Sequence, residues 1–283
     1  MARFEAADIR RYYDRQTAGF LALGQGGDEG AIHRAVWAPG VTSRPQAFHY
    51  VEDRIADWID VLDDAHPPHV VDLGCGVGGS LCHLAGRVPL RGTGITISPV
   101  QARLATARLA ARGLSDRVRC LEGDYTSLPD DLAPADLAFA IESFVHGPSP
   151  ERFFASAARL IRPGGRLVIC DDVRRPTDDP EAAAAVAQFM RGWHVNTLLT
   201  REALVAAASA EGFTLESATD LTPWLELGRP RDRAIALAVR LFGWLPLHRT
   251  PFAHVVGGVA LQRCLRQGWM AYELACFQRT GRR

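Results

Sequence analysis

The chain has 283 residues, and its 32 basic and 32 acidic side chains cancel. This length fits one large α/β domain with a smaller appendage better than two equal domains. Since there is no net charge to attract polyanions, we expect a small or neutral substrate rather than nucleic acid or an anionic membrane. The N-terminus is charged where a signal peptide is apolar, and no uncharged stretch reaches about 18 apolar residues, so we expect a cytoplasmic protein without membrane insertion.

Two features of residue usage bear on origin and redox state. Every basic residue is arginine and none is lysine, which suggests the coding bias of a GC-rich, bacterial genome. The six cysteines form no Cys-x-x-Cys pair and lie mostly in apolar runs, as reduced core cysteines do. We therefore expect neither a zinc site nor a disulfide framework.

The N-terminal part of the chain predicts a helical segment outside the main sheet. Helical spacing covers residues 7 to 23, a glycine-rich run follows at 24–30, and helical spacing resumes from 46 to 62. Pro67-Pro68 then marks the entry to a new element. We interpret residues 1–64 as a lid segment and residues 65–283 as the core.

Strand-like and helix-like segments alternate after residue 68. Strands are predicted at 69–73, 92–97, 118–122, 137–141, 166–170 and 270–278, and helices at 79–85, 99–112, 150–160, 180–190, 200–211, 231–242 and 257–268. Such alternation predicts a doubly wound, mainly parallel sheet. The span 180–255 is expected to include a helical cap that shapes a pocket.

The chemistry-bearing feature of this core is the glycine-rich turn after the first strand. Asp72 closes that strand, while Gly74, Gly76 and Gly78 permit tight backbone conformations before a helix that presents free N–H groups. An NAD-dependent oxidoreductase would instead show the spacing G-x-G-x-x-G and a ribose-binding acid after the second strand.

The turn Val70-Val71-Asp72-Leu73-Gly74-Cys75-Gly76-Val77-Gly78-Gly79 resembles motif I of class I S-adenosylmethionine (SAM)-dependent methyltransferases. The resemblance implies a Rossmann-like, seven-stranded α/β fold with SAM as cofactor. It also implies that the cofactor contacts Asp72, Gly74, Cys75 and Gly76. A merely tight strand-to-helix turn is the alternative.

The residues at the end of the second strand indicate a particular subgroup of this family. Gly94-Ile95-Thr96-Ile97-Ser98-Pro99-Val100-Gln101 lacks the usual acid and is similar to tocopherol, sterol and sugar methyltransferases. By that resemblance Thr96, Ile97 and Gln101 lie on the ribose side, although neutral groups give weaker hydrogen bonds than a carboxylate. Ser98 is equally well read as a helix N-cap.

The third strand leads into Asp124 and Tyr125, where the family places side chains against the adenine. Asp124 could accept a hydrogen bond from the exocyclic amine of the adenine. Tyr125 could pack at the ring edge, or could simply bridge surface and core.

The fourth and fifth strands carry the catalytic candidates. His146 follows the fourth strand, and its imidazole can accept a proton at neutral pH, so we predict a general base. Asp171, at the end of the fifth strand, is predicted to stabilise the imidazolium, as in the sugar and natural-product O-methyltransferases that this segment resembles. Glu142 is a candidate to contact the cofactor or to take part in catalysis. A metal held by Asp171 and Asp172 is not expected, because adjacent strand residues point to opposite faces.

Aromatic and histidine side chains supply the remaining candidates. Tyr13 is expected to cover the cofactor, as the early tyrosines of related small-molecule methyltransferases do. Acceptor-binding candidates are His33, Trp37, Phe144, Trp193 and Trp224. Packing of aromatic side chains onto the sheet is the alternative for all of them.

Together these observations predict a SAM-dependent O-methyltransferase of bacterial specialised metabolism, with His146 as base and a small molecule as acceptor. The runner-up is C- or N-methylation of an isoprenoid, aromatic or alkaloid-like metabolite, in which Glu142 would stabilise a cation or take the proton. An NAD-dependent oxidoreductase and a non-catalytic binding protein are the alternatives from other classes. Monomer and homodimer both remain open.

Overall fold

A computed structural model describes residues 4–23, 33–62, 66–242 and 253–280 of the chain. The glycine-rich run at 24–30 lies outside the described residues. Trp244 and His248, which fall within the predicted cap span, lie outside them as well.

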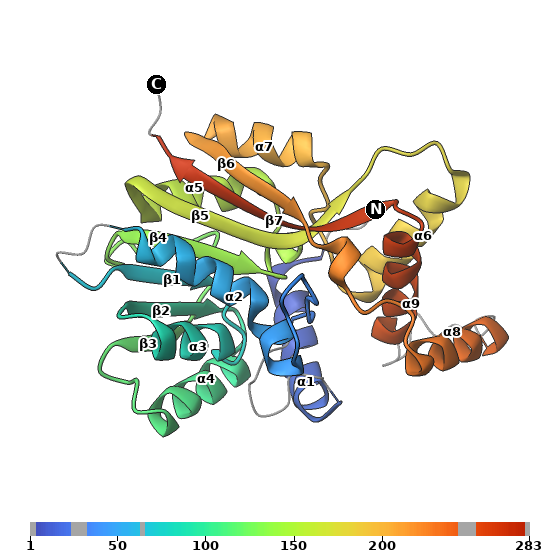
Figure 1. The fold of residues 1–283 in the computed structure, drawn as a ribbon, viewed down its shortest axis with the longest axis horizontal. Coiled ribbons are helices and arrows are strands. Elements are labelled where there is room, and N and C mark those ends of the chain that lie inside the picture. The colour runs from blue at the N-terminus through green and yellow to red at the C-terminus, as the bar shows by residue number, and fades with distance from the viewer. Residues whose placement is uncertain (1–3, 24–32, 63–65, 243–252, 281–283) are drawn as a thin grey trace.

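A seven-stranded sheet forms the centre of the molecule, in the order β3-β2-β1-β4-β5-β7-β6 (Figure 1). Among the strands of the described residues, β7 alone runs opposite to the other six, so its pairings with β5 and β6 are antiparallel. The prediction of a doubly wound, mainly parallel α/β fold is therefore confirmed, with one additional strand, β6, that the sequence analysis did not predict. The strands are β1 His69–Leu73, β2 Arg91–Thr96, β3 Val118–Glu122, β4 Ala135–Ile141, β5 Ile161–Arg174, β6 Phe213–Asp220 and β7 Met270–Arg279.

The register of the parallel strands brings their carboxyl ends to one edge of the sheet. Asp72 in β1 lies beside Gly94 in β2 and Phe139 in β4, and Ile141 at the end of β4 lies beside Cys170 in β5. The loops that follow these strands therefore meet, which is where ligands bind in open parallel sheets.

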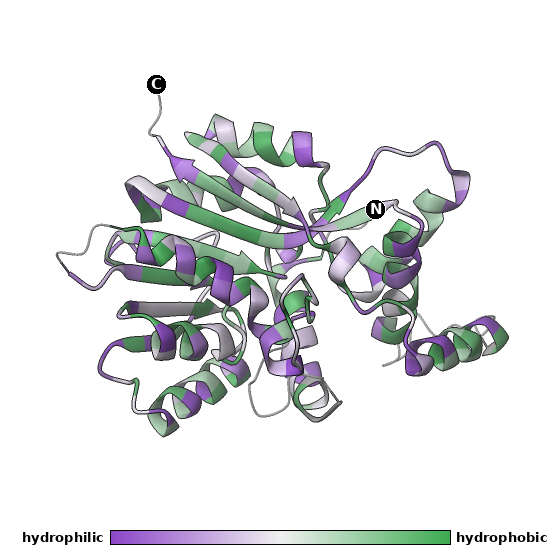
Figure 2. Cartoon of the chain, in the orientation of Figure 1, coloured by the Kyte–Doolittle hydropathy of each residue, from purple (hydrophilic) through white to green (hydrophobic). Residues whose placement is uncertain are grey.

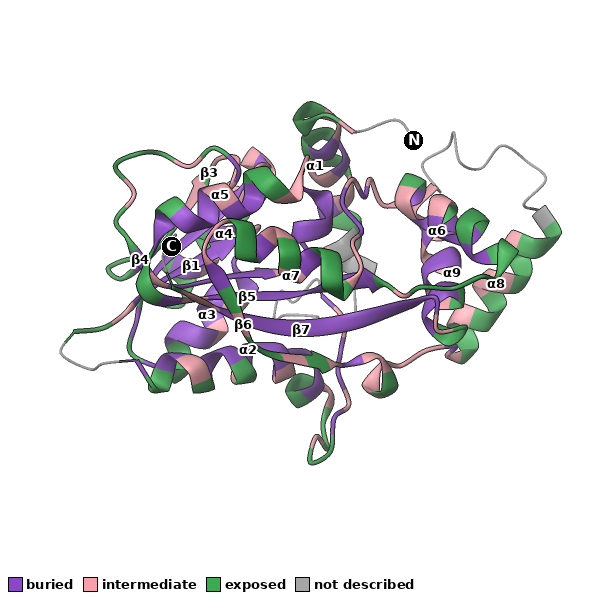
Figure 3. Ribbon diagram, turned by 90° about the horizontal axis from the view of Figure 1, so that it is seen from above, coloured by how far each residue is buried: buried purple, intermediate pink, exposed green. Residues whose placement is uncertain are grey.

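Helices cover both faces of the sheet, so its central strands are apolar on both sides (Figures 2 and 3). Val70 packs in a cluster with α2 and α3, whereas its neighbour Val71 packs on the opposite face with α5 and α7. The helices are α1 Ala6–Leu23, α2 Arg44–Asp60, α3 Gly79–Arg87, α4 Pro99–Ala111, α5 Pro150–Leu160, α6 Pro180–Gly192, α7 Arg201–Ala210, α8 Pro230–Phe242 and α9 Ala253–Arg266, with short 3₁₀ turns η2 Phe144–His146 and η3 Thr222–Trp224.

Helix starts follow local capping chemistry. The side chain of Ser43 caps α2 in a capping box with Gln46, and Ser149 and Thr200 cap α5 and α7 by accepting from the backbone. Ser98 caps α4 in the same way, so the N-cap reading of this residue is confirmed.

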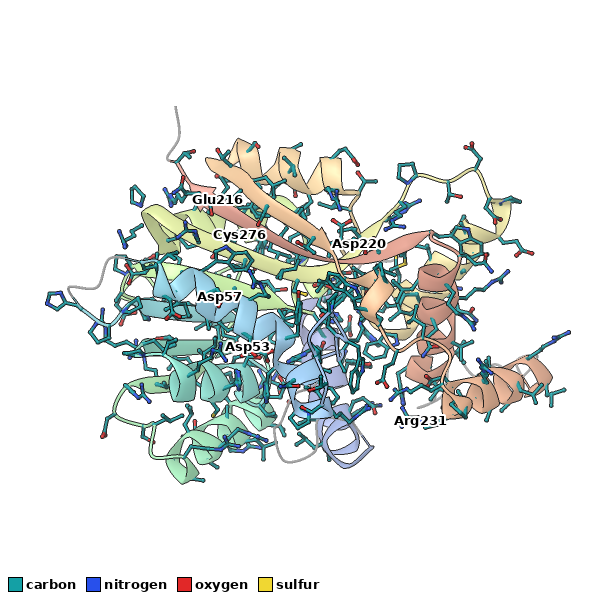
Figure 4. All side chains as sticks on the ribbon, in the orientation of Figure 1. Asp53, Asp57, Glu216, Asp220, Arg231 and Cys276 are labelled. Atoms are coloured by element: carbon teal, nitrogen blue, oxygen red, sulfur yellow. The ribbon has the colours of Figure 1, made fainter. Side chains whose placement is uncertain are left out.

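Helices α6 and α9 pack against one another at the right of Figure 1, in an apolar cluster separate from the two faces of the sheet. Gly192 and Gly257 allow close backbone approach, because a Cβ on Gly192 would lie 2.7 Å from the Cα of Gly257. Figure 4 shows Arg231 at the beginning of α8, beside this pair. The predicted cap span 180–255 is interrupted, however: α7 and β6 fall within it and belong to the core of the sheet.

Within the described residues, no helix is both long and apolar enough to span a membrane. All six cysteines are free thiols.

Candidate active site

A large cavity opens at the carboxyl ends of the parallel strands, with a volume of about 930 Å³. Its described wall combines the loops after β1, β2, β4 and β5 with parts of α1, α6, α8 and α9. This volume lies near the upper end of the range for ligand pockets, so it has room for a cofactor and an acceptor side by side.

The glycine-rich turn forms one end of the cavity. Asp72, Gly74, Cys75 and Gly76 all line it, as the sequence analysis predicted. Gly74 adopts φ +109°, and a Cβ there would lie 2.3 Å from the Cβ of Ser143. The backbone thus passes close to the next loop, and only glycine fits.

Gly78 is the N-cap of α3, has a left-handed backbone conformation and offers no side-chain cap. The first N–H groups of the helix therefore remain available at the cavity, where they favour a negatively polarised ligand group.

Thr96, Ile97 and Gln101 line the cavity after β2. Thr96 Oγ1 donates to Gln101 Oε1 at 2.8 Å, and Gln101 Nε2 donates to Thr17 Oγ1 of α1 at 3.2 Å. Ser98 Oγ donates to Asp14 of the same helix at 2.5 Å. These contacts fasten α1 over the end of β2, so the proposed ribose-side residues also hold the N-terminal helix.

Asp124 and Tyr125 line the next part of the cavity. One oxygen of Asp124 accepts from the backbone and the hydroxyl of Thr126, both at 2.8 Å. The Tyr125 hydroxyl donates to the carbonyl of Ser143 at 2.7 Å, so this side chain bridges the loops after β3 and β4.

His146 is buried on η2 and lines the cavity. Its Nδ1 lies 3.2 Å from the carbonyl of His194, which requires that Nδ1 carries the proton. Nε2 then accepts from the Tyr13 hydroxyl at 2.8 Å. Burial lowers the pKa of His146 to about 4, so the imidazole is neutral at physiological pH.

Asp171 does not pair with His146, and this prediction is wrong. Its carboxylate accepts from the backbone N–H of Val145 at 3.1 Å and of Asp172 at 2.9 Å. Burial, and then the neighbouring Asp172, raise the pKa of Asp171. The side chain therefore holds η2 in place, while a carbonyl rather than a carboxylate orients His146.

Glu142 adopts φ +49° and belongs to a network that the sequence analysis missed. Its Oε1 accepts from the backbone N–H of Arg34 at 2.8 Å and from the Tyr272 hydroxyl at 2.9 Å. The Arg34 guanidinium donates twice to Asp172, at 2.8 and 2.7 Å. No local pattern indicated this network, because Arg34 and Asp172 lie 138 positions apart.

His33 lines the cavity next to the glycine-rich turn, and its buried partner Glu52 was also missed. His33 Nε2 lies 2.6 Å from Glu52 Oε1, which also accepts from Ser80 at 2.9 Å. Burial lowers the pKa of His33, but Glu52 more than offsets it, and the net result is a pKa of about 9. The cavity therefore carries a buried ion pair at neutral pH.

Among the aromatic acceptor candidates, Trp193 lines the cavity, whereas the described wall does not include Trp37, Phe144 or Trp224. Phe144 packs in the core, edge to face against Phe153. Trp37 packs beside α2, and Trp224 packs in the cluster that α2 and α3 form with the sheet. The three predictions are wrong because these rings bury their surface against the protein itself.

A doubly wound sheet, a glycine-rich turn with an acid closing its strand, and one cavity across the strand ends define a class I methyltransferase site. The comparisons agree. A family model described as "Methyltransferase domain" matches residues 70–165. The O-methyltransferase cnsE of Penicillium expansum is 32% identical over 216 residues, covering 76% of this chain and 75% of that protein.

A second relative is more similar over a shorter stretch. "Probable tocopherol O-methyltransferase, chloroplastic" from Oryza sativa subsp. japonica is 40% identical over 128 residues, which cover 44% of this chain and 35% of that protein. The chain thus spans about a third of the length of this relative. Further relatives are named as C- and N-methyltransferases.

The solved structure of the [4+2]-cyclase SpnF covers 100% of this chain and 98% of its own, with a TM-score of 0.74 and 24% identity, and so shares the fold. The chain belongs to the SAM-dependent small-molecule methyltransferases, and its cofactor is SAM. This confirms the predicted class and cofactor.

Proposed function

We propose that the protein transfers the methyl group of SAM to a hydroxyl group of a small, largely apolar molecule, with His146 as general base. The observation that carries the proposal is the 2.8 Å hydrogen bond from the Tyr13 hydroxyl to His146 Nε2 inside the cofactor cavity. A buried, neutral imidazole whose unprotonated nitrogen accepts a hydrogen bond from a hydroxyl is a proton acceptor already in place.

The residues of the glycine-rich turn fit the cofactor. Gly74 lies so close to Ser143 that no side chain fits there, and the uncapped start of α3 offers N–H groups. Asp72 and the turn would hold the methionyl part, Thr96 and Gln101 the ribose, and Asp124 and Tyr125 the adenine. When bound, SAM supplies a methyl group that is already activated on a sulfonium.

The chain must then align the acceptor and remove its proton. Burial raises the pKa of Tyr13, so this side chain is a neutral phenol. We propose that Tyr13 relays the proton: its oxygen accepts the acceptor's proton while its own proton passes to His146 Nε2. Because burial disfavours an imidazolium, proton transfer accompanies methyl transfer rather than preceding it.

The far end of the cavity supports an apolar acceptor. Six apolar side chains from the cap helices and the loops beside them face it: Phe189, Trp193, Val195, Leu225, Ile235 and Leu261. We propose that residues 1–64 cover the cofactor, that α6, α8 and α9 shape this acceptor chamber, and that the enzyme works in bacterial specialised metabolism in the cytoplasm. The arginine-only basic composition and the similarity to methyltransferase GfsG of Streptomyces halstedii support the bacterial origin.

Glu142 is less suited to the role of base. Its Oε1 already accepts from the Arg34 backbone and from Tyr272, which favours a structural part in holding the loop. Since relatives include C- and N-methyltransferases, the acceptor atom is the first property to measure.

The test is a His146→Ala variant assayed with a panel of hydroxylated aromatic, isoprenoid and polyketide compounds. We expect turnover of the acceptor found with the wild type to fall by about 10²–10⁴-fold, with nearly unchanged SAM affinity in a calorimetric titration. Unchanged turnover would remove His146 as base. If Glu142→Gln abolished turnover while His146→Ala did not, the C- or N-methylation scheme would replace ours.

A further inference from the structure

Three side chains surround the guanidinium of Arg34 in the wall of the cavity. Asp172 binds it through two parallel hydrogen bonds of 2.8 and 2.7 Å, and Glu142 Oε1 lies 3.3 Å from Nε. The ring of Tyr272 lies beneath it, 4.2 Å from the guanidinium carbon. An aromatic face with two carboxylates is the combination that binds organic cations.

Two members of this cage are buried and two are partly exposed. The Asp172 side chain is 2% exposed and Tyr272 is fully buried, whereas the side chains of Arg34 and Glu142 are 23% and 20% exposed. The carboxylate of Asp172 is strongly destabilising in such a place without a cation, because water cannot solvate it. Arg34 is that cation: burial lowers its pKa, but Asp172 and Glu142 more than offset the effect, and the net pKa is raised.

The cage also connects two parts of the site. Glu142 adopts a left-handed backbone conformation that is uncommon for residues other than glycine. The backbone N–H of Arg34 and the Tyr272 hydroxyl hold its carboxylate, while its own N–H donates to Cys170 in β5 at 2.8 Å. His33 and Ala35, on either side of Arg34, both line the cofactor cavity.

We propose that Tyr272, Glu142 and Asp172 form a binding site for an organic cation, occupied by the guanidinium of Arg34, and that Arg34 thereby fastens residues 33–35 over the cofactor cavity. Arg34 is a positioning residue: it acts through the segment that carries it and through Glu142. The proposal depends on the cofactor site alone and is independent of the acceptor atom and of the role of His146.

The test is chemical rescue of an Arg34→Ala variant, with S-adenosylhomocysteine (SAH) as the calorimetric probe. If the segment is correctly placed in only about a tenth of the variant molecules, SAH binds about tenfold more weakly. Guanidinium chloride at about 20 mM should refill the cage and restore most of the affinity. It denatures negligibly at this concentration, since m-values are a few kcal/mol per molar. Sodium chloride at the same concentration should restore nothing.

The matched control is Arg201→Ala. Arg201 makes the same two-bond contact with a buried carboxylate, Glu273, at 2.8 and 2.7 Å, but neither residue lines the cofactor cavity. We expect its SAH affinity to equal that of the wild type, with or without guanidinium. An Arg34→Ala variant that is less stable in urea yet binds SAH like the wild type would overturn the proposal, as would failure of guanidinium to restore affinity.

A second variant keeps the test decisive if Arg34→Ala does not fold. Arg34→Lys retains the charge but not the planar fork that binds Asp172 through two bonds. Its SAH affinity should be several-fold below that of the wild type. Affinity equal to the wild type would show that the two-bond geometry has no part in positioning the segment.

Discussion

The buried ion pair of His33 and Glu52 makes stability depend on pH in a direction that can be calculated. His33 has a pKa of about 9, against 6.5 for an unperturbed histidine. One pKa unit corresponds to about 1.4 kcal/mol, so the charged state stabilises the fold by about 3 kcal/mol. Both side chains are almost fully buried, and solvent therefore screens this interaction little.

The direction in which stability changes with pH follows from the protons that the folded and the unfolded chain bind. Between pH 6.5 and 9 the folded protein keeps the proton on His33 while the unfolded chain has lost it. The contribution of the pair is thus fully present below pH 6.5 and is lost as the pH rises through 9. Glu52→Gln keeps the shape and removes the charge, so this decline of the free energy of unfolding should disappear in the variant.

The assay is urea unfolding of the wild type and the variant at several pH values from 6.5 to 9. The control is Asp53→Asn on the same helix, where Figure 4 labels Asp53. Asp53 makes a 2.8 Å contact with His83, but both side chains are partly exposed. Exposed ion pairs contribute about 0–1 kcal/mol to the free energy of unfolding. The free energy of unfolding of this variant should therefore change with pH as that of the wild type does. If Glu52→Gln also paralleled the wild type, the reasoning about a buried charged pair would be refuted.

Two further predictions concern the cavity. Since the pKa of His146 is about 4, methyl transfer should stay constant from pH 8 to about pH 5 and be lost as pH falls through 4; a pH–rate profile with a midpoint near 6.5 would contradict a buried base. Gly74→Ala should weaken SAH binding about 100-fold by titration, because left-handed backbone strain adds to a 2.3 Å clash with Ser143. Gly113→Ala, with φ +65° and open space around it, should leave SAH affinity unchanged.

Local sequence patterns predicted most of the sheet and the cofactor end of the site. The apolar strands, the glycine-rich turn and the helix caps each depend on residues that lie within a few positions of one another. Strand β6 was missed because it pairs on one side only, at the edge of the sheet, and buries little besides Phe213. The residues of β6 are mostly polar and partly exposed, so apolar and polar residues do not alternate clearly enough to predict a strand.

Contacts between distant residues could not be predicted in the same way. The pairing of His146 with Asp171 failed because that carboxylate accepts instead from the backbone N–H groups of Val145 in η2 and of Asp172 in β5. The bonds from Arg34 to Asp172 and from His33 to Glu52 depend on where the N-terminal segment lies on the sheet. Three of the five aromatic and histidine acceptor candidates turned out to be packing residues, because a large ring is buried wherever the fold offers apolar surface.

Helix α1 contacts the site through three side-chain hydrogen bonds: Tyr13 binds His146, Asp14 binds Ser98, and Thr17 binds Gln101. They lie within five residues of one helix, so lifting the helix breaks all three together. Exchange of spent cofactor past this helix would therefore disconnect the proton relay at the same moment. If the proposed relay operates, methyl transfer would be confined to molecules in which α1 is in place, and loading of the cofactor would be separated from the reaction.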